Sequence, residues 1–291
     1  MKYRALPPRE GQRGVALLLV LWACTLLAIL LGGYAAMART EGLQARYQFA
    51  QTQAHYAAEA GLMRAIYGLQ DPRLDQRWIG DGRAYKFKYD VATVVVQVID
   101  EDGKVDLNTD MPEALQGLFR ATGLPPAQAS QLASRVVDWR GAPTVANEAE
   151  SQRVAYAAAG LDYAPRHGPF ATIEEAQMVL GMTPALYRQI APVLTIWAGN
   201  ASPNPNTAPM LALQAIPGIT PQQLATIQAT RARNAHDSSL ALNSGTTHSI
   251  QSEATLADGT RAVLRATIRM QPGLAGVKPY AVLRWLEGKQ E

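Results

Sequence analysis

The sequence has one cysteine, Cys24, so no disulfide can form within a single chain. Its four histidines are not spaced with one another, with the cysteine or with carboxylates as metal ligands are. It also lacks a Gly-rich phosphate-binding loop, a dinucleotide fingerprint and a G-x-S-x-G nucleophile motif. These absences give no ground for predicting an enzyme, and a net charge of +3 gives none for predicting nucleic-acid binding.

Charge is absent from one long stretch near the N-terminus. No Asp, Glu, Lys or Arg occurs from Gly14 through Ala38. At about 1.5 Å rise per residue, a helix of this length crosses a hydrocarbon core of roughly 30 Å. Four basic residues precede it: Lys2, Arg4, Arg9 and Arg13. The pattern predicts a cytoplasmic leader (residues 1–14), one transmembrane helix (residues 15–38) and export of the remaining chain.

Two alternatives to this anchor are a secretory signal peptide and a plain one-span anchor. Ala36-Met37-Ala38 resembles a signal-peptide cleavage site, but the apolar run 15–31 is longer than the usual apolar core of such peptides. Small and apolar residues then recur at helical spacing as far as Leu69. This periodicity predicts one continuous helix whose exported part covers residues 39–70, which a cleaved signal peptide would not require.

The junction Arg13-Gly14-Val15 resembles the leader junction of type IV pilins and type II secretion pseudopilins. In those families prepilin peptidase cuts directly after a Gly, so the resemblance implies processing between Gly14 and Val15. Most members carry Glu at the fifth mature position, where this chain has Leu19. That departure resembles the K class of minor pseudopilins, which sit at the pilus tip. A membrane-buried Glu is costly unless it is paired, and a tip subunit has no subunit above it to supply a pairing amine.

Two parts of the sequence show the alternation of β-strands. Residues 85–99 alternate apolar and polar side chains, and so do residues 250–270 around an Asp258-Gly259 hairpin signal. Residues 279–285 are predicted to be a last strand. We therefore expect an antiparallel sheet, built from residues 71–105 and 238–291, that packs on the N-terminal helix.

The middle of the chain, residues 106–237, has a helical pattern with an internal repeat. Gly123, Gly181 and Gly218 each precede a Pro by two or three residues, an order that caps one helix and starts the next. The three predicted hairpins resemble helix-hairpin-helix modules, many of which offer backbone N–H groups to a DNA phosphate. The second Gly of that module is replaced here by Pro125, Thr183 or Thr220, which favours a structural use. The predicted fold class is α+β: a pilin-like long helix packed on an antiparallel sheet, with a large all-α insertion domain of helix-hairpin-helix-like repeats.

The order of motifs in this region resembles the helical domain of K-class pseudopilins. It contains an Asp-Trp phrase, an Ala-Glu segment, a Gly-Pro-Phe entry and a Gly-Met-Thr hairpin, at 138–139, 149–150, 168–170 and 181–183. The resemblance implies a tip subunit of the type II secretion pseudopilus that assembles with minor pseudopilins of the I and J classes and binds no nucleic acid. The alternative is a membrane-anchored periplasmic helix-hairpin-helix protein that binds DNA.

Two further sets of residues are candidate sites. In K-class pseudopilins the loop after Asp-Trp is usually acidic and is associated with calcium, whereas this chain has Gly141-Ala142-Pro143-Thr144 there. Oxygen ligands for calcium are still available, and the assignment stays open: Asp138, Glu148 and Glu150. Small residues along the exported helix predict close helix approach, and the expected contacts with partner pseudopilins are Ala54, Ala58 and Gly61.

Overall fold

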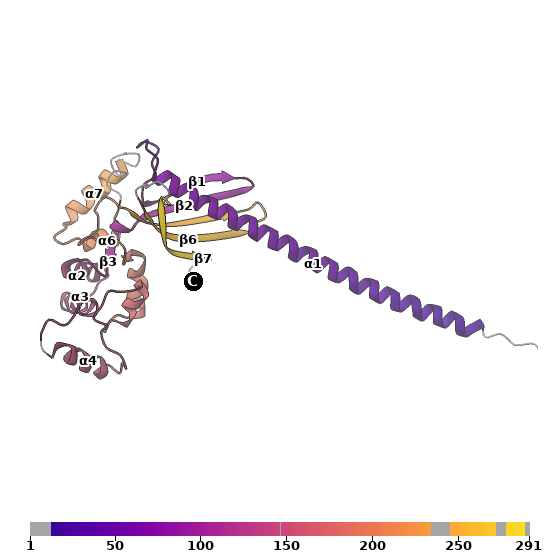
Figure 1. Ribbon diagram of the computed structural model, residues 1–291, viewed down its shortest axis with the longest axis horizontal. Helices are drawn as coiled ribbons and strands as arrows, with labels where there is room; N and C mark the ends of the chain where they lie inside the picture. The colour runs from indigo at the N-terminus through magenta and orange to yellow at the C-terminus, as the bar shows by residue number, and fades with distance from the viewer. Residues whose placement is uncertain (1–12, 146, 234–244, 272–277, 289–291) are drawn as a thin grey trace, which may run out of the picture. The chain divides into compact units, whose positions relative to one another are not determined.

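The computed structural model describes residues 13–145, 147–233, 245–271 and 278–288. The chain divides between Gln53 and Ala54 into two compact units. Helix α1, Arg13–Leu69, contributes to both units (Figure 1). The predicted leader residues 1–12 and the predicted boundary at 237–238 lie outside the described residues.

The first unit is the N-terminal part of α1, where exposed apolar side chains surround the helix. Leu17, Trp22 and Leu30 are all more than 60% exposed, and a helix that is apolar on all sides suits a lipid environment. Thr25 Oγ1 donates to the carbonyl of Trp22 at 2.8 Å, so the hydroxyl is satisfied within the helix. In the described residues, this is the one helix long and apolar enough to cross a membrane.

The second unit contains a five-stranded antiparallel sheet in the order β1-β2-β5-β6-β7 (Figure 1). Its strands are β1 (Asp81–Tyr89), β2 (Ala92–Asp100), β5 (Thr247–Thr255), β6 (Arg261–Met270) and β7 (Tyr280–Glu287). The turn between β5 and β6 contains Gly259, whose φ of +87° is in the left-handed region that the Asp-Gly signal predicts. The predicted antiparallel sheet is confirmed.

The last turns of α1 pack on one face of this sheet. Val94, Val96 and Val98 point toward the helix at alternate positions of β2 and are completely buried. A Cβ built on Gly61 would lie 2.7 Å from Val94 Cγ1 and 2.2 Å from Ser252 Oγ. The helix approaches the sheet this closely because Gly61 has no side chain.

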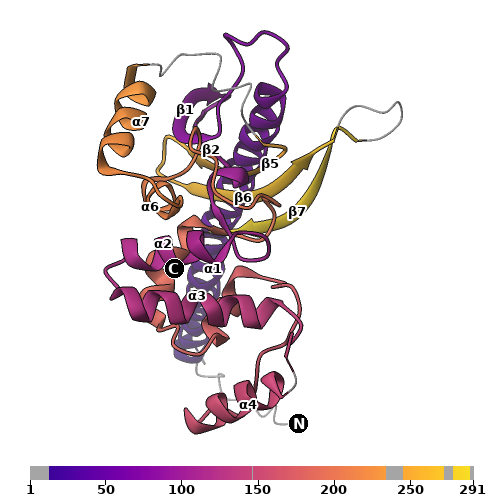
Figure 2. The ribbon, with the colours of Figure 1, turned by 90° about the vertical axis from the view of Figure 1, so that its left-hand side faces the viewer.

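Between β2 and β5 the chain forms a helical region, which Figure 2 shows from the side. Its elements are η1 (Glu101–Gly103), β3 (Val105–Asp106), α2 (Pro112–Ala121), α3 (Pro126–Arg140), α4 (Glu148–Ala158), η2 (Ile173–Met178), α5 (Pro184–Ile190), η3 (Ala191–Val193), β4 (Leu194–Thr195), α6 (Met210–Ala215) and α7 (Pro221–Arg233). The short strands β3 and β4 pair in parallel. Leu115, Phe119 and Trp139 lie in the core of this region.

Three helical elements end in a glycine in the left-handed conformation, as the sequence predicts. The φ angles are +95° at Gly123, +93° at Gly181 and +75° at Gly218. Thr220 forms a capping box: its Oγ1 accepts from Gln223 N at 3.2 Å, and its N–H donates to Gln223 Oε1 at 2.8 Å. The element before Gly181 is the 3₁₀ helix η2, and the helix-hairpin-helix-like repeats stay a prediction.

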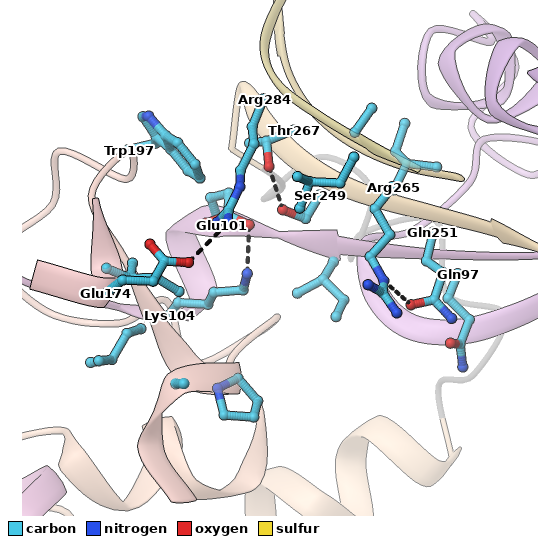
Figure 3. Close-up of a pocket in the computed structure, with 18 of the residues that line it drawn as sticks. Gln97, Glu101, Lys104, Glu174, Trp197, Ser249, Gln251, Arg265, Thr267 and Arg284 are labelled. Carbon is cyan, nitrogen blue, oxygen red and sulfur yellow. Dashed lines mark hydrogen bonds and ion pairs between the residues drawn. The ribbon is translucent and has the colours of Figure 1, made fainter. Parts of the chain in front are cut away.

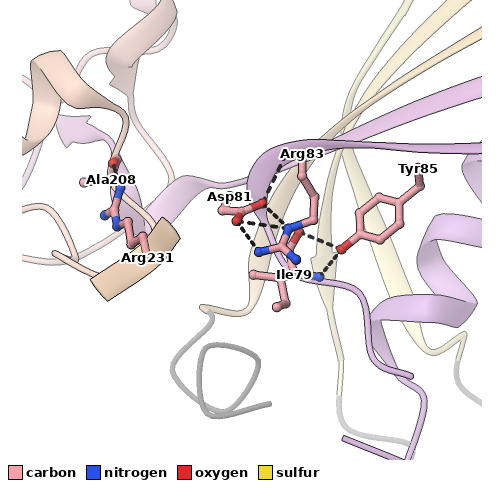
Figure 4. A network of polar contacts seen from close by, with 6 residues as sticks. All are labelled: Ile79, Asp81, Arg83, Tyr85, Ala208 and Arg231. Carbon is pink, nitrogen blue, oxygen red and sulfur yellow. Dashed lines mark hydrogen bonds and ion pairs between the residues drawn. The ribbon is translucent and has the colours of Figure 1, made fainter. Parts of the chain in front are cut away.

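The entry to the sheet and the end of the helical region are held by polar contacts (Figure 4). Arg83 pairs with Asp81 at 2.6 Å, and Tyr85 Oη accepts from Ile79 N at 2.7 Å. In α7, Arg231 donates to the carbonyl of Ala208 at 2.8 Å. These contacts fix the start of β1 and tie α7 to the loop before α6.

Candidate functional site

The small residues in the C-terminal part of α1 face the protein's own sheet. Ala54 and Ala58 have no exposed surface, and Gly61 lies against Val94 and Ser252. The prediction that Ala54, Ala58 and Gly61 contact partner pseudopilins is therefore wrong. Small side chains do allow a close approach, but here the element that approaches is the sheet of the same chain.

The opposite side of α1 carries an exposed apolar stripe formed by Tyr56, Met63 and Tyr67. Their exposed fractions are 62%, 39% and 70%. At about 100° per residue, positions i, i+7 and i+11 share one helix face. Tyr280 Oη of β7 donates to Met63 Sδ at 3.6 Å, so β7 borders the stripe. The sequence did not lead to a prediction for these residues, although their spacing at positions i, i+7 and i+11 is typical of one helix face.

The carboxylates predicted to bind calcium have other roles. Glu148 Oε2 accepts from the N–H groups of Thr144 and Val145 at 2.6 and 3.1 Å, and these bonds lower its pKa. Glu150 pairs with Arg153 at 2.6 Å. Within the described ranges no group of three His, Cys, Asp or Glu residues could hold a metal ion. Asp138, Glu148 and Glu150 therefore do not form the predicted site.

Trp139, the second residue of the Asp-Trp phrase, instead lies in the helical core. Trp139 Nε1 donates to Glu175 Oε1 at 2.8 Å, and its ring stacks on Phe170 with centroids 6.2 Å apart. The half-buried carboxyl of Asp138 has a raised pKa because of burial and, secondarily, the charge of Glu148. Motifs that are more than 30 residues apart in the sequence thus meet in one cluster.

A cleft of about 550 Å³ lies between the outer face of the sheet and the helical region (Figure 3). Its sheet wall carries both apolar side chains, such as Ile99 and Leu286, and polar ones: Gln97, Ser249, Gln251, Arg265, Thr267 and Arg284. Its other wall includes Glu174, Tyr187, Arg188 and Trp197. These residues come from elements on both sides of the helical insertion, so no local motif in the sequence marks the cleft.

Two ion pairs cross or border this cleft. Arg284 Nη2 of β7 lies 2.9 Å from Glu174 Oε1 of η2, and Lys104 Nζ lies 2.6 Å from Glu101 Oε1 (Figure 3). The Arg284–Glu174 pair joins the last strand of the sheet to the helical region. Glu174 and Glu101 are therefore already paired with Arg284 and Lys104. The other two cations that line the cleft, Arg188 and Arg265, form an ion pair with neither carboxylate.

The fold and its sites define a class of protein with a long, N-terminally apolar helix whose C-terminal part packs on an antiparallel sheet, and with a helical region inserted in that sheet. Residues 88–199 match the family model described as type II secretion system (T2SS), protein K. This segment belongs to that family, and the K-class recognition from the sequence is confirmed.

A solved structure has the same fold. It is the crystal structure of the GspK-GspI-GspJ complex from the type 2 secretion system of enterotoxigenic Escherichia coli. The matched chain is 18% identical, with a TM-score of 0.54, and the match covers 87% of this chain and 100% of that chain. No curated protein matches the sequence at a significant level.

Proposed function

We propose that this chain is a minor pseudopilin at the tip of the type II secretion pseudopilus, where it initiates and caps the filament during protein secretion across the outer membrane. The observation that carries the proposal is the helical region between β2 and β5, in a segment that belongs to the protein K family. A bulky insertion on a helix-and-sheet subunit would obstruct a further subunit above it. The role is structural, not catalytic.

The N-terminal part of α1 is the anchor in this proposal. Prepilin peptidase removes the leader between Gly14 and Val15, and the apolar helix stays in the inner membrane with the bulk of the chain in the periplasm. The uncharged run and the basic residues before it support this orientation. N-terminal sequencing of the membrane-extracted protein tests it: Val15 is the expected first residue, whereas a start at Arg39 would establish a cleaved signal peptide.

The proposed partners are minor pseudopilins of the I and J classes. The similar crystal structure is a complex of GspK with GspI and GspJ, which supports this choice. The surface offered to them is the stripe of Tyr56, Met63 and Tyr67, because exposed aromatic side chains on one helix face suit helix packing. This surface replaces the buried small residues of the first prediction.

Co-purification from detergent extracts tests the stripe. Tyr56→Glu combined with Tyr67→Glu is expected to lower recovery of the I and J partners by at least about tenfold, since it places two charges in an apolar contact. Tyr89→Glu is the matched control, because Tyr89 is 50% exposed but lies in β1. Undiminished recovery with the double variant would show that another surface binds the partners.

The DNA-binding alternative gains no support from the hairpins. Pro125 has no N–H to offer, and the N–H of Thr220 already donates to Gln223 Oε1 at 2.8 Å. Arg135 also donates to its own chain, at the carbonyl of Leu180. Groups that would bind a phosphate are thus used to hold the helical region together.

A further inference from the structure

The cleft has positive charges that its own carboxylates do not neutralise. Glu101 is paired with Lys104 at 2.6 Å and Glu174 with Arg284 at 2.9 Å. Two more cations line the cleft, Arg188 and Arg265. Among the residues that the structure describes, neither has a carboxylate oxygen within 4.0 Å. The cleft therefore attracts a negatively charged ligand.

The sheet wall forms the floor of the cleft. It consists of two parallel rows of side chains that run across the strands. Strand register places Gln97, Gln251, Arg265 and Leu286 in one row, and Ile99, Ser249, Thr267 and Arg284 in the next. With strands about 4.8 Å apart, a row across four strands spans roughly 14 Å, the length of about four to five extended residues. Figure 3 shows Gln97, Gln251 and Arg265 side by side on this floor.

The chemistry of the floor fits a polypeptide. A glutamine amide both donates and accepts hydrogen bonds. Gln251 Oε1 accepts from Arg265 and Gln97 Nε2 donates to the carbonyl of Gly82, so Gln251 Nε2 and Gln97 Oε1 are the amide atoms offered to the C=O and N–H groups of an extended backbone. Arg265 reaches Gln251 Oε1 through Nε at 2.9 Å, which holds its guanidinium over the floor. Tyr187 and Trp197 on the other wall offer apolar contact to side chains.

We propose that this cleft binds an extended, acidic segment of another polypeptide, with carboxylates at Arg188 and Arg265. A peptide can place its charges at two points and keep neutral residues near Glu101 and Glu174. A nucleic acid carries a charge on every phosphate and would bring charges close to both glutamates, and its phosphates cannot donate to the glutamine amides. The cleft volume of about 550 Å³ is also in the range of small ligand sites. The proposal is independent of the tip assignment.

Fluorescence anisotropy with the full-length chain in detergent micelles tests this site. The probe is a fluorescein-labelled peptide, Gly-Glu-Ser-Val-Glu-Gly, compared with the same peptide carrying Gln or Lys in place of both Glu residues. We expect the Glu peptide to bind most tightly and to weaken as salt rises. Equal binding of the Glu and Gln peptides would overturn the proposal.

Variants locate the site. Arg188→Gln and Arg265→Gln are each expected to weaken binding of the Glu peptide by about two- to fivefold, and the double variant by about four- to 25-fold. Arg188 is exposed on α5, so its substitution leaves the fold intact. Arg120→Gln is the matched control, because Arg120 is an exposed cation on α2 away from the cleft. Unchanged binding by the double variant, or an equal loss in the control, would contradict the site.

Competition separates the peptide from other anions. A polypeptide site predicts that sodium sulfate displaces the probe no better than sodium chloride of equal ionic strength. Displacement by sulfate at low millimolar concentration would make this a site for small anions. Displacement by an oligothymidylate at the concentration of unlabelled Glu peptide would make it a nucleic-acid site. Either result overturns the proposal.

Discussion

At the scale of single residues, two neighbouring aspartates in the helical region differ in their hydrogen bonding. Asp106 accepts from Asn108 N at 2.7 Å and from Gly199 N at 2.9 Å, whereas both carboxyl oxygens of Asp110 are buried without a hydrogen-bond partner among the described residues. Asp110 is completely buried, and burial followed by the charge of Asp106 raises its pKa to about 8. Asp110 is therefore protonated in the folded protein at neutral pH, whereas it is ionised in the unfolded chain.

This difference predicts how stability depends on pH. Because the folded pKa of Asp110 is above the unfolded value, its contribution to the free energy of unfolding is fully present below about pH 4 and is lost as pH rises to about 8. Asp110→Asn removes that loss. The variant is expected to match the wild type near pH 4 and to exceed it by about 2–4 kcal/mol at pH 8 in urea unfolding followed by circular dichroism.

The difference in the free energy of unfolding between Asp110→Asn and the wild type isolates the effect of Asp110. Burial lowers the pKa of His248 to about 4, so His248 destabilises both proteins in the same way as pH falls below about 6.5. Asp162→Asn serves as the control, since Asp162 is exposed. Parallel pH profiles for Asp110→Asn and the wild type would show that Asp110 is ionised in the folded state.

At the scale of elements, the packing of α1 on the sheet depends on one glycine. A Cβ at position 61 would lie 2.2 Å from Ser252 Oγ and 2.7 Å from Val94 Cγ1, and neither side chain is a long flexible one. Gly61→Ala is expected to lower the free energy of unfolding by about 1–3 kcal/mol through overpacking. The measurement is urea unfolding of the full chain in detergent.

Gly42→Ala is the matched control in the same helix. No atom lies within 4 Å of a Cβ at Gly42, so this change is expected to be neutral or to stabilise the helix by up to about 1 kcal/mol. Equal effects at the two glycines would mean that helix propensity, and not contact with the sheet, decides the outcome. The result also bears on the first prediction for Gly61, under which this residue contacts a partner pseudopilin and not the sheet of its own chain.

Much of the fold could be predicted because its signals are local. The alternation in β2, the Asp258-Gly259 turn and the caps at Gly123 and Thr183 depend on residues only a few positions apart. A stripe of small residues is different, because it shows that something packs closely without showing what does. The same Ala and Gly spacing fits a partner helix or the chain's own sheet. For Ala58 the prediction of a partner helix is wrong, because its side chain is buried in its own chain.

The sites were predicted less well because they depend on contacts between distant residues. The family-like order around Asp138 suggested a carboxylate cluster, but Glu150 pairs with Arg153 three residues away, and Glu148 binds backbone N–H groups. The cleft joins Glu174 to Arg284, 110 positions later in the sequence. Only the arrangement of the helical region against the sheet brings such residues together.

At the scale of the whole molecule, the fifth residue after the predicted cut, Leu19, bears on whether copies of this chain can assemble with one another. Leu19 is 66% exposed on an apolar helix and has no charge. In a membrane-embedded filament, a Glu at this position is stabilised by pairing with the N-terminal amine of a neighbour, and without a partner it is costly. Under the proposed tip position Leu19 avoids that cost, because no neighbour would lie above this subunit, and it would also remove the contact that holds copies of such a chain together.

We therefore expect the full chain, produced with prepilin peptidase but without other pseudopilins, to form no long filaments. Electron microscopy of the sheared surface fraction is the measurement, and a pseudopilin that carries Glu at the fifth mature position is the positive control. Addition of the I and J partners should give soluble or membrane-bound complexes of fixed size by size-exclusion chromatography, because the helical insertion obstructs growth at the exposed end. Long filaments made of this chain alone would contradict both the role of Leu19 and the tip position.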